Sequence, residues 1–189
     1  MIYPVYVYGT GVLRKKAKEI PRDYEGLTEL IDNMFETMYS AEGVGLAAPQ
    51  IGKSLRLFIV DATAVEEDDE EYQEEFKKVF INPVMVDETG EEWSFNEGCL
   101  SIPLIREDVS RKPAIRIQYY DENWNFHDET FDGVKARIIQ HEYDHLEGIL
   151  FVDKINPLRR RLLNSKLNAI SKGKVDINYR IRIPQPKKR

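Results

Sequence analysis

The sequence predicts an α+β fold, in which antiparallel β-sheets pack around a central helix and a further helix lies near the C-terminus. In the middle of the chain, short runs of β-branched and aromatic residues mark strands, whereas spacings of three and four residues mark helices on either side. The strands precede the later helices without the regular alternation of a parallel sheet. Together these patterns favour an α+β fold.

The first helix is predicted from Leu27 to Met38. Its apolar residues recur every three or four positions, which places them on one stripe of a helix of about four turns. They are Leu27, Leu30, Ile31, Met34, Phe35 and Met38. This stripe needs an apolar surface to pack against.

Three segments rich in β-branched and aromatic residues are predicted to be strands. They are 55–60, 79–86 and 114–120. Residues 121–123 then connect the last of them to 124–131, so we expect these two segments to form an antiparallel hairpin.

Two helices are predicted after the hairpin. The first begins after Asp132-Gly133, where helical spacing returns, and Gly148 is placed to end it. The second begins at Asn156, a good N-cap followed by proline, and Gly173 ends it. Its apolar stripe is expected to dock on the body of the protein and consists of Leu158, Leu162, Leu163, Leu167 and Ile170.

The size and composition of the chain indicate one domain of a soluble protein. It has 189 residues and 22.1 kDa, with 42% hydrophobic and 32% charged residues. We expect a single catalytic domain over 1–173 and a basic tail over 174–189. No apolar run approaches the ~18 residues of a membrane span, and the first residues lack the features of a secretory signal. The expected location is the cytoplasm, with no membrane partner.

The net charge of −6 is divided unevenly along the chain. From Lys154 onward there are twelve Lys and Arg residues and one acid, which gives +11 and leaves −17 for the rest. Such a segment favours contact with an anionic partner such as RNA, although it is also typical of a solvated helix face. Acidic residues crowd 62–76, which we expect to be a surface loop.

Two histidines flank a glutamate in the helix predicted after Gly133. In His141-Glu142-Tyr143-Asp144-His145 the four-residue spacing puts both imidazoles on one helix face, about one turn apart. Two histidines so placed can bind one metal ion, while Glu142 lies beside them and can move a proton. The alternative is an amphipathic helix whose histidines pair with acids such as Asp144. The motif makes this central helix the predicted metal-binding helix.

A catalytic metal site of this kind needs a third protein ligand. No histidine follows His145, and the later acids offer no strong candidate. The remaining candidate is Cys99, the single cysteine, which lies in a segment fixed by glycine and proline. A lone cysteine is otherwise most often a small buried hydrophobe.

Three separated motifs together resemble the peptide deformylase family of bacterial type. They are Gly43-Val44-Gly45-Leu46-Ala47-Ala48-Pro49-Gln50, Glu97-Gly98-Cys99-Leu100-Ser101 and Gln140-His141-Glu142-Tyr143-Asp144-His145-Leu146-Glu147-Gly148. Their order and approximate spacing also agree with the family over roughly residues 1 to 170. The acidic segment and the tail past Gly173 depart from it.

The resemblance implies a metal-dependent hydrolase that removes the formyl group from the N-terminal formylmethionine of new polypeptides and releases formate. It implies that Cys99, His141 and His145 bind one divalent ion, expected to be Fe²⁺ in the cell, with Zn²⁺, Ni²⁺ or Co²⁺ as alternatives. Glu142 then moves the proton. The Gln50 side chain and the Leu100 backbone N–H donate to the oxyanion.

The resemblance also implies how the substrate binds. The residues expected to contact it are Gly43, Val44, Gly45, Gly98, Arg106, Val134 and Ile138. Main-chain groups of Val44 and Gly98 would bond the peptide, the glycines would allow its backbone to approach closely, and Val134 and Ile138 would line a pocket for methionine with His141.

Further residues are expected to support the site from behind. By resemblance Arg111 lies near the site, and we expect it to pair with Glu97 and thereby orient Cys99, with Asp144 close by. His127 lies outside all three motifs and is expected to be an ordinary surface histidine.

The expected partners are nascent peptides that begin with formylmethionine and, through the basic C-terminal segment, the ribosome. Two other functions compete with this interpretation. One is an H-E-x-x-H metallopeptidase that cleaves within chains, and the other is a structural metal site in a protein associated with RNA.

Overall fold

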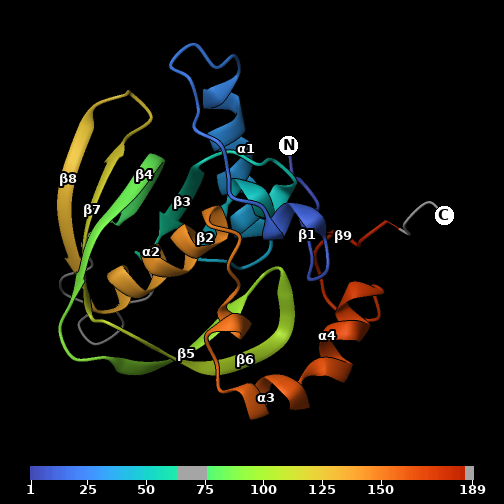
Figure 1. Ribbon diagram of the computed structural model, residues 1–189. Helices are drawn as coiled ribbons and strands as arrows, with labels where there is room; N and C mark the ends of the chain where they lie inside the picture. The colour runs from blue at the N-terminus through green and yellow to red at the C-terminus, as the bar shows by residue number, and fades with distance from the viewer. Residues whose placement is uncertain (64–75, 186–189) are drawn as a thin grey trace.

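The computed structural model describes residues 1–63 and 76–185, and it has the α+β architecture that the sequence predicts (Figure 1). Helix α2 (Gly133–Leu146) lies at the centre, with a five-stranded sheet on one side and the pair β5 and β6 below it in this view. Both of these sheets are antiparallel.

The five-stranded sheet has the strand order β2-β3-β4-β7-β8. Its strands are β2 (Gly45–Ala47), β3 (Leu57–Asp61), β4 (Lys77–Thr89), β7 (Ala114–Tyr120) and β8 (Phe126–Asp132). The three predicted strands and the hairpin are confirmed, although β8 begins two residues later than expected. The reason is that Asp121 accepts hydrogen bonds from the backbone N–H groups of Asn123 and Asn125, which extends the turn.

The two longest helices cover opposite faces of this sheet. Successive residues of a strand point to opposite faces, so Leu57 and Ile59 of β3 pack on the apolar stripe of α1 (Leu27–Ser40). Phe58 and Val60 instead join the core cluster that contains α2. The buried face of α2 therefore packs against this side of the sheet, which fixes the position of the helix.

The pair formed by β5 (Trp93–Cys99) and β6 (Ile102–Arg111) is not predicted from the sequence. The residues of β6 do alternate, but two of the inward positions are Glu107 and Arg111, and buried charges hide the strand pattern. The pairing slips between Gly98 and Cys99, where the register shifts. Such an irregularity re-aims the side chain at the end of the strand, which here is Cys99.

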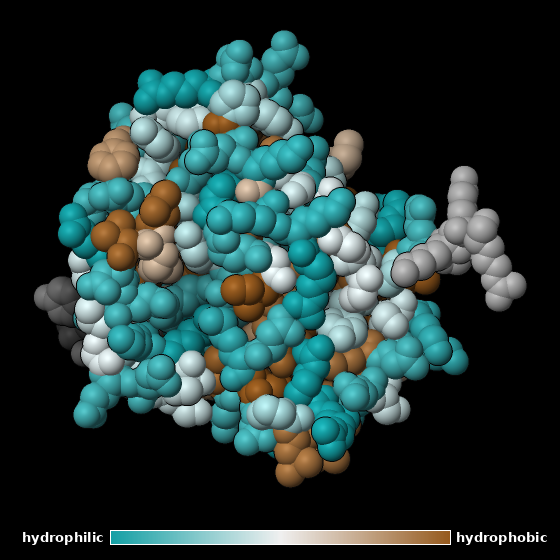
Figure 2. Space-filling view, viewed as in Figure 1, coloured by the Kyte–Doolittle hydropathy of each residue, from teal (hydrophilic) through white to brown (hydrophobic). Residues whose placement is uncertain are grey.

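The C-terminal helix is broken in two, so the single predicted helix is wrong in part. Helices α3 (Pro157–Leu162) and α4 (Asn164–Ser171) meet at Leu163. The expectation that Leu158 and Leu162 dock on the body is also wrong, because they are 64% and 66% exposed and only Leu163, Leu167 and Ile170 are buried. Figure 2 shows hydrophobic side chains at the surface over α3. The change of direction at Leu163 turns the stripe of α3 away from the core.

The segment after Gly173 returns to the body and pairs with the first strand of the chain. Its strand β9 (Ile181–Arg182) pairs in parallel with β1 (Val5–Tyr6), at the right of Figure 1. Over residues 1–63 and 76–185 the structure also has three short 3-10 helices, at Gly11–Arg14, at Ala48–Ile51 (η2) and at Phe151–Asp153. No helix in the described residues is long and apolar enough to cross a membrane.

The surface loop expected over 62–76 is wrong at its two ends. Ala62 and Phe76 are buried, and the Ala62 N–H donates to the Phe76 carbonyl at 2.8 Å. An apolar residue at each end belongs to the core beside β3 and β4. The acidic residues 66–75 lie outside the described residues.

Candidate metal centre

Cys99, His141 and His145 come together although the cysteine is more than forty positions from the histidines. Their ligand atoms lie within 4.8 Å of one another, and within the described ranges no other three His, Cys, Asp or Glu residues form such a group. The Cys99 Sγ lies 3.3 Å from His145 Nε2. Tetrahedral zinc, with S and N at about 2.3 and 2.0 Å, would separate them by about 3.5 Å. The group therefore fits one metal ion.

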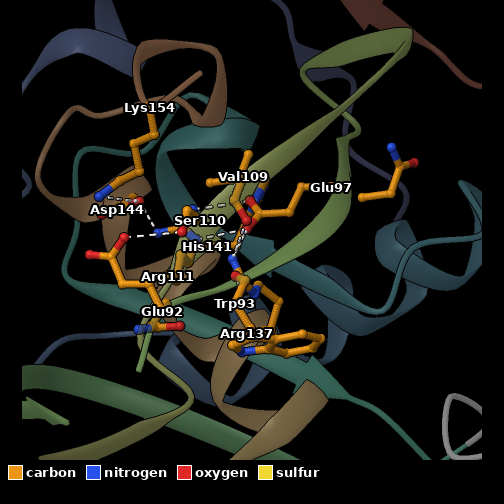
Figure 3. A network of polar contacts seen from close by, with 12 residues as sticks. Glu92, Trp93, Glu97, Val109, Ser110, Arg111, Arg137, His141, Asp144 and Lys154 are labelled. Carbon is orange, nitrogen blue, oxygen red and sulfur yellow. Dashed lines mark hydrogen bonds and ion pairs between the residues drawn. The ribbon is translucent and has the colours of Figure 1, made fainter. Parts of the chain in front are cut away.

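The Glu97 carboxylate supports this group from behind (Figure 3). Its Oε2 lies 3.0 Å from His141 Nδ1, and it accepts two hydrogen bonds from Arg111, at 2.7 and 3.0 Å. Arg111 also donates to Asp144 at 2.6 Å. The expected pair of Glu97 and Arg111 is present, but the ligand that it contacts is His141. Its expected effect on the orientation of Cys99 stays a prediction.

Arg137 is a member of this network that the sequence analysis missed. It is 2% exposed and donates to Glu97 Oε1 at 3.0 Å and to the backbone carbonyl of Trp93 at 2.7 Å. It precedes His141 by one helical turn, so an arginine on the buried face of α2 was the available signal. The result is a carboxylate held by two guanidinium groups.

The charges of the network favour an ionised Glu97 that accepts a hydrogen bond from His141. Burial opposes ionisation of Glu97, but hydrogen bonds from His141 and Arg111 outweigh it and hold the pKa of Glu97 well below its usual value. An ionised Glu97 accepts a hydrogen bond from the Nδ1–H of His141, which leaves the Nε2 lone pair free to bind a metal. Burial lowers the pKa of His145, which favours the neutral form that binds metals.

Glu142 lies beside the three ligands and is nearly enclosed. It is 4% exposed, and its Oε2 has no hydrogen-bond partner among the described residues. Burial raises the pKa of Glu142 to about 7. A carboxyl group with this pKa can both accept and release a proton near neutral pH.

Gln50 reaches the site from η2 and is 1% exposed. Its Oε1 accepts a hydrogen bond from the Ala47 N–H at 2.8 Å, and this contact fixes the direction of the amide. Its Nε2 then donates to Ser101 Oγ at 3.2 Å and lies 3.5 Å from Cys99 Sγ. An N–H donor is thus held next to the sulfur.

A cavity of about 740 Å³ opens beside these groups. All seven expected substrate residues line it, together with Gln50, Leu100, His141 and Glu142. The sequence analysis missed two of its walls, which are formed by β6 residues 102–106 other than Arg106 and by residues 176–179 of the C-terminal segment. His145, Arg111 and Asp144 lie behind the cavity and do not line it.

The glycines of the first motif meet neighbours within the protein. A Cβ at Gly45 would lie 2.5 Å from Glu142 Oε1, and one at Gly43 would lie 2.9 Å from Leu100 Cδ1. Gly45 therefore makes room for the Glu142 carboxylate, a role that the sequence analysis did not predict.

His127 is placed away from the centre, as expected. It lies on β8, its side chain is 31% exposed, and its Nε2 is 2.9 Å from Asp121 Oδ2. It is a surface histidine.

Comparison with known proteins identifies the family. Residues 2–161 match the family model described as polypeptide deformylase. The chain belongs to the polypeptide deformylase family. It is 57% identical to the peptide deformylase of Christiangramia forsetii, over all of this chain and 99% of that protein, and 54% identical to that of Flavobacterium psychrophilum over the full length of both.

Solved structures of deformylases share the fold. The crystal structure of the Legionella pneumophila enzyme has a TM-score of 0.79 and 38% identity, covering 92% of this chain and 98% of that one. The Thermus thermophilus enzyme has a TM-score of 0.80 and 37% identity, covering 92% and all of that chain. A deformylase is a metallohydrolase that removes the formyl group from nascent peptides, and this is the function of the chain. The comparisons support neither an endopeptidase nor a structural metal protein.

Proposed function

We propose that this deformylase performs its reaction at the centre formed by Cys99, His141 and His145, with Glu142 as the group that moves the proton. The observation that carries the proposal is the meeting of three metal-ligand atoms within 4.8 Å beside a cavity that Glu142 also lines. A divalent ion held there would supply a Lewis acid for the formyl carbonyl and would lower the pKa of a water.

Glu142 serves first as a base and then as an acid. Its carboxylate takes a proton from the attacking water and later gives that proton to the leaving amine. Burial supports this double role, because it brings the pKa of Glu142 to about 7. The products are formate and a free N-terminus.

Gln50 and Leu100 stabilise the negative oxygen that develops on the formyl carbon. The Gln50 Nε2 and the Leu100 N–H act as donors, a role worth about 2.7 to 4 kcal/mol per donor in other enzymes. The support is the fixed Gln50 amide beside Cys99. Such a donor needs no reorientation during the reaction.

The substrate lies along the cavity. Val44 and Gly98 offer main-chain bonds to the peptide, Val134 and Ile138 enclose the methionine side chain, and Arg106 lies at the cavity wall. We assign Fe²⁺ as the ion in the cell. One thiolate with two imidazoles also suits Zn²⁺, Ni²⁺ and Co²⁺.

The test compares two activities in wild type and Glu142→Ala. Wild type should release formate from a formyl-Met peptide without cleaving casein, and the variant should keep its fold and metal while turnover falls by about 10² to 10⁴-fold. Casein cleavage at a comparable rate would favour a peptidase. Unchanged formate release by Glu142→Ala would remove this residue from its role.

We also propose that the enzyme works in the cytoplasm and contacts the ribosome through its basic C-terminal segment. Arg161, Lys166, Lys172 and Lys174 are exposed there, and none of them forms an ion pair within residues 1–63 and 76–185. An acidic body would be repelled by RNA phosphates, so a basic segment would orient the enzyme.

A further inference from the structure

The turn between β5 and β6 carries two groups of the proposed reaction. Cys99 ends β5, and Leu100 begins the turn that leads into β6 at Ile102. A small rotation of this turn would move the Leu100 N–H, which is a proposed oxyanion donor. The position of the turn therefore matters for the chemistry.

Three hydrogen bonds from distant parts of the chain hold this turn. The Tyr8 N–H donates to the Ser101 carbonyl at 2.9 Å, and Gln50 Nε2 donates to Ser101 Oγ at 3.2 Å. The third comes from the C-terminal segment, where the Tyr179 hydroxyl donates to the Leu100 carbonyl at 2.7 Å. Only the bond from Tyr179 acts on Leu100 itself.

The Tyr179 hydroxyl is fixed in place by its own segment. The Arg180 carbonyl accepts from the Val5 N–H at 2.8 Å, and the Arg182 carbonyl accepts from the Val7 N–H at 3.1 Å. On the other side, Asn178 Nδ2 lies 3.4 Å from Glu42 Oε1. Tyr179 is half-buried at the cavity wall, so its hydroxyl reaches Leu100 from a segment bonded at both sides.

We propose that Tyr179 is a positioning residue for deformylation. Its hydroxyl fixes the Leu100 carbonyl and thereby limits rotation of the turn that carries the Leu100 N–H, while residues 176–179 form one wall of the substrate cavity. This inference rests on the proposed role of Leu100. The segment after Gly173 would then contribute to the reaction itself, in addition to the proposed contact of its basic side chains with the ribosome.

The test uses Tyr179→Phe, which keeps the ring and removes only the hydroxyl. The matched control is Tyr8→Phe, because Tyr8 is also half-buried and its hydroxyl accepts from Arg160 Nη2 at 3.0 Å, outside the cavity. The backbone bond of Tyr8 to Ser101 is unaffected by this change. We expect Tyr179→Phe to lower kcat for a formyl-Met peptide by about threefold to tenfold, with little change in KM, the unfolding midpoint or metal content. The control should keep its kcat.

Amide hydrogen exchange provides a readout that does not depend on activity. Exchange at Leu100 and Ser101 should speed up in Tyr179→Phe and stay as in wild type in Tyr8→Phe. Equal kcat and equal exchange in the two variants, or a loss of kcat matched by a loss of folded protein, would overturn the inference. Failure of the proposed function would instead appear as absence of formate release by the unchanged enzyme.

Discussion

At the scale of single residues, the space between Gly45 and Glu142 decides whether the proposed base can reach its place. Gly45 is in β2 and Glu142 is in α2, and a Cβ on the glycine would come 2.5 Å from the Oε1 atom. Real Cβ contacts are never this short, so the carboxylate would have to move. The position of the Glu142 side chain thus depends on the absence of a side chain at Gly45.

Gly45→Ala should therefore reduce kcat through displacement of Glu142. We expect a loss of about 10- to 100-fold, because small misplacements of a reacting group cost this much. Formate release and the unfolding midpoint should be measured together. Gly11→Ala is the control, since a Cβ there meets nothing within 4 Å. If Gly45→Ala were as active as Gly11→Ala, the contact with Glu142 would have no catalytic importance.

Cys99→Ser should weaken metal binding, because a hydroxyl is a poor substitute for a thiolate on a soft metal. We expect a loss of affinity of at least about tenfold. Metal content after dialysis against a chelator measures it. His127→Ala should retain metal like wild type, since this histidine lies on β8 outside the group of three ligands and pairs with Asp121. Full occupancy in dialysed Cys99→Ser would contradict the assignment of the third ligand.

The residues of the metal centre differ in how well they can be predicted from the sequence. The two histidines and Glu142 follow from a spacing within one helix, and a helix has the same geometry in every fold. Cys99 required the family resemblance, because its place depends on the register shift at the end of β5. Arg137 and Tyr179 lie outside the motifs, and their contacts depend on β5 and on the pairing of the chain ends.

At the scale of elements, regular patterns are predicted well and interrupted ones are not. Helix α1 and strands β3, β4 and β7 have apolar sides that the sequence displays directly. In β6 the inward positions include Arg111, whose charge is neutralised by Glu97 and Asp144, so its burial depends on partners far along the chain. The break at Leu163 is likewise not visible in the apolar stripe, which runs through it.

The hairpin of β7 and β8 provides a prediction at this scale. Burial alone would raise the pKa of Asp121, but hydrogen bonds from His127 and Asn125 outweigh it and lower the pKa to about 2. The folded pKa is therefore below the unfolded value. The ionised carboxylate contributes stability above a pH of about 4, and this contribution is lost as the pH falls through about 2.

Asp121→Asn should lower the free energy of unfolding by roughly 1 kcal/mol at pH 7, allowing for the partial exposure of the turn. The difference from wild type should shrink as the pH is lowered from 5 to 3. Urea denaturation at several pH values measures it. Asp23→Asn, at an exposed position, serves as control and should show no such trend. A difference that stays constant with pH would mean that the charge of Asp121 is not involved.

At the scale of the whole molecule, β9 of the C-terminal segment pairs with β1, and residues 176–179 just before β9 line the substrate cavity. The pairing of β1 with β9 involves two residues in each strand, which is too short to leave a pattern in the sequence. It nevertheless brings residues 176–179 to the cavity. Deleting the tail would remove the cavity wall formed by residues 176–179 together with the basic side chains. A test of ribosome binding should therefore change the charge of these side chains and keep the chain length.

The last prediction concerns that contact. Reversing Arg161, Lys166 and Lys172 to glutamate should leave hydrolysis of a free formyl peptide nearly unchanged, because these residues are exposed and do not line the cavity. Binding to ribosomes should weaken, and the dependence of log K on log salt should become less steep by about 2 to 3, near one per lost phosphate contact. Sedimentation with ribosomes at several salt concentrations measures both effects.

The control carries the same change of charge elsewhere, at Lys18, Lys53 and Lys112, which lie before β3 or just after β6. If net charge alone governed binding, the two triple variants would lose affinity equally. We expect the C-terminal variant to lose more, because its three charges lie within 12 consecutive residues of one basic segment. Equal sedimentation of the C-terminal variant and wild type at low salt would show that the segment is only a solvated terminus.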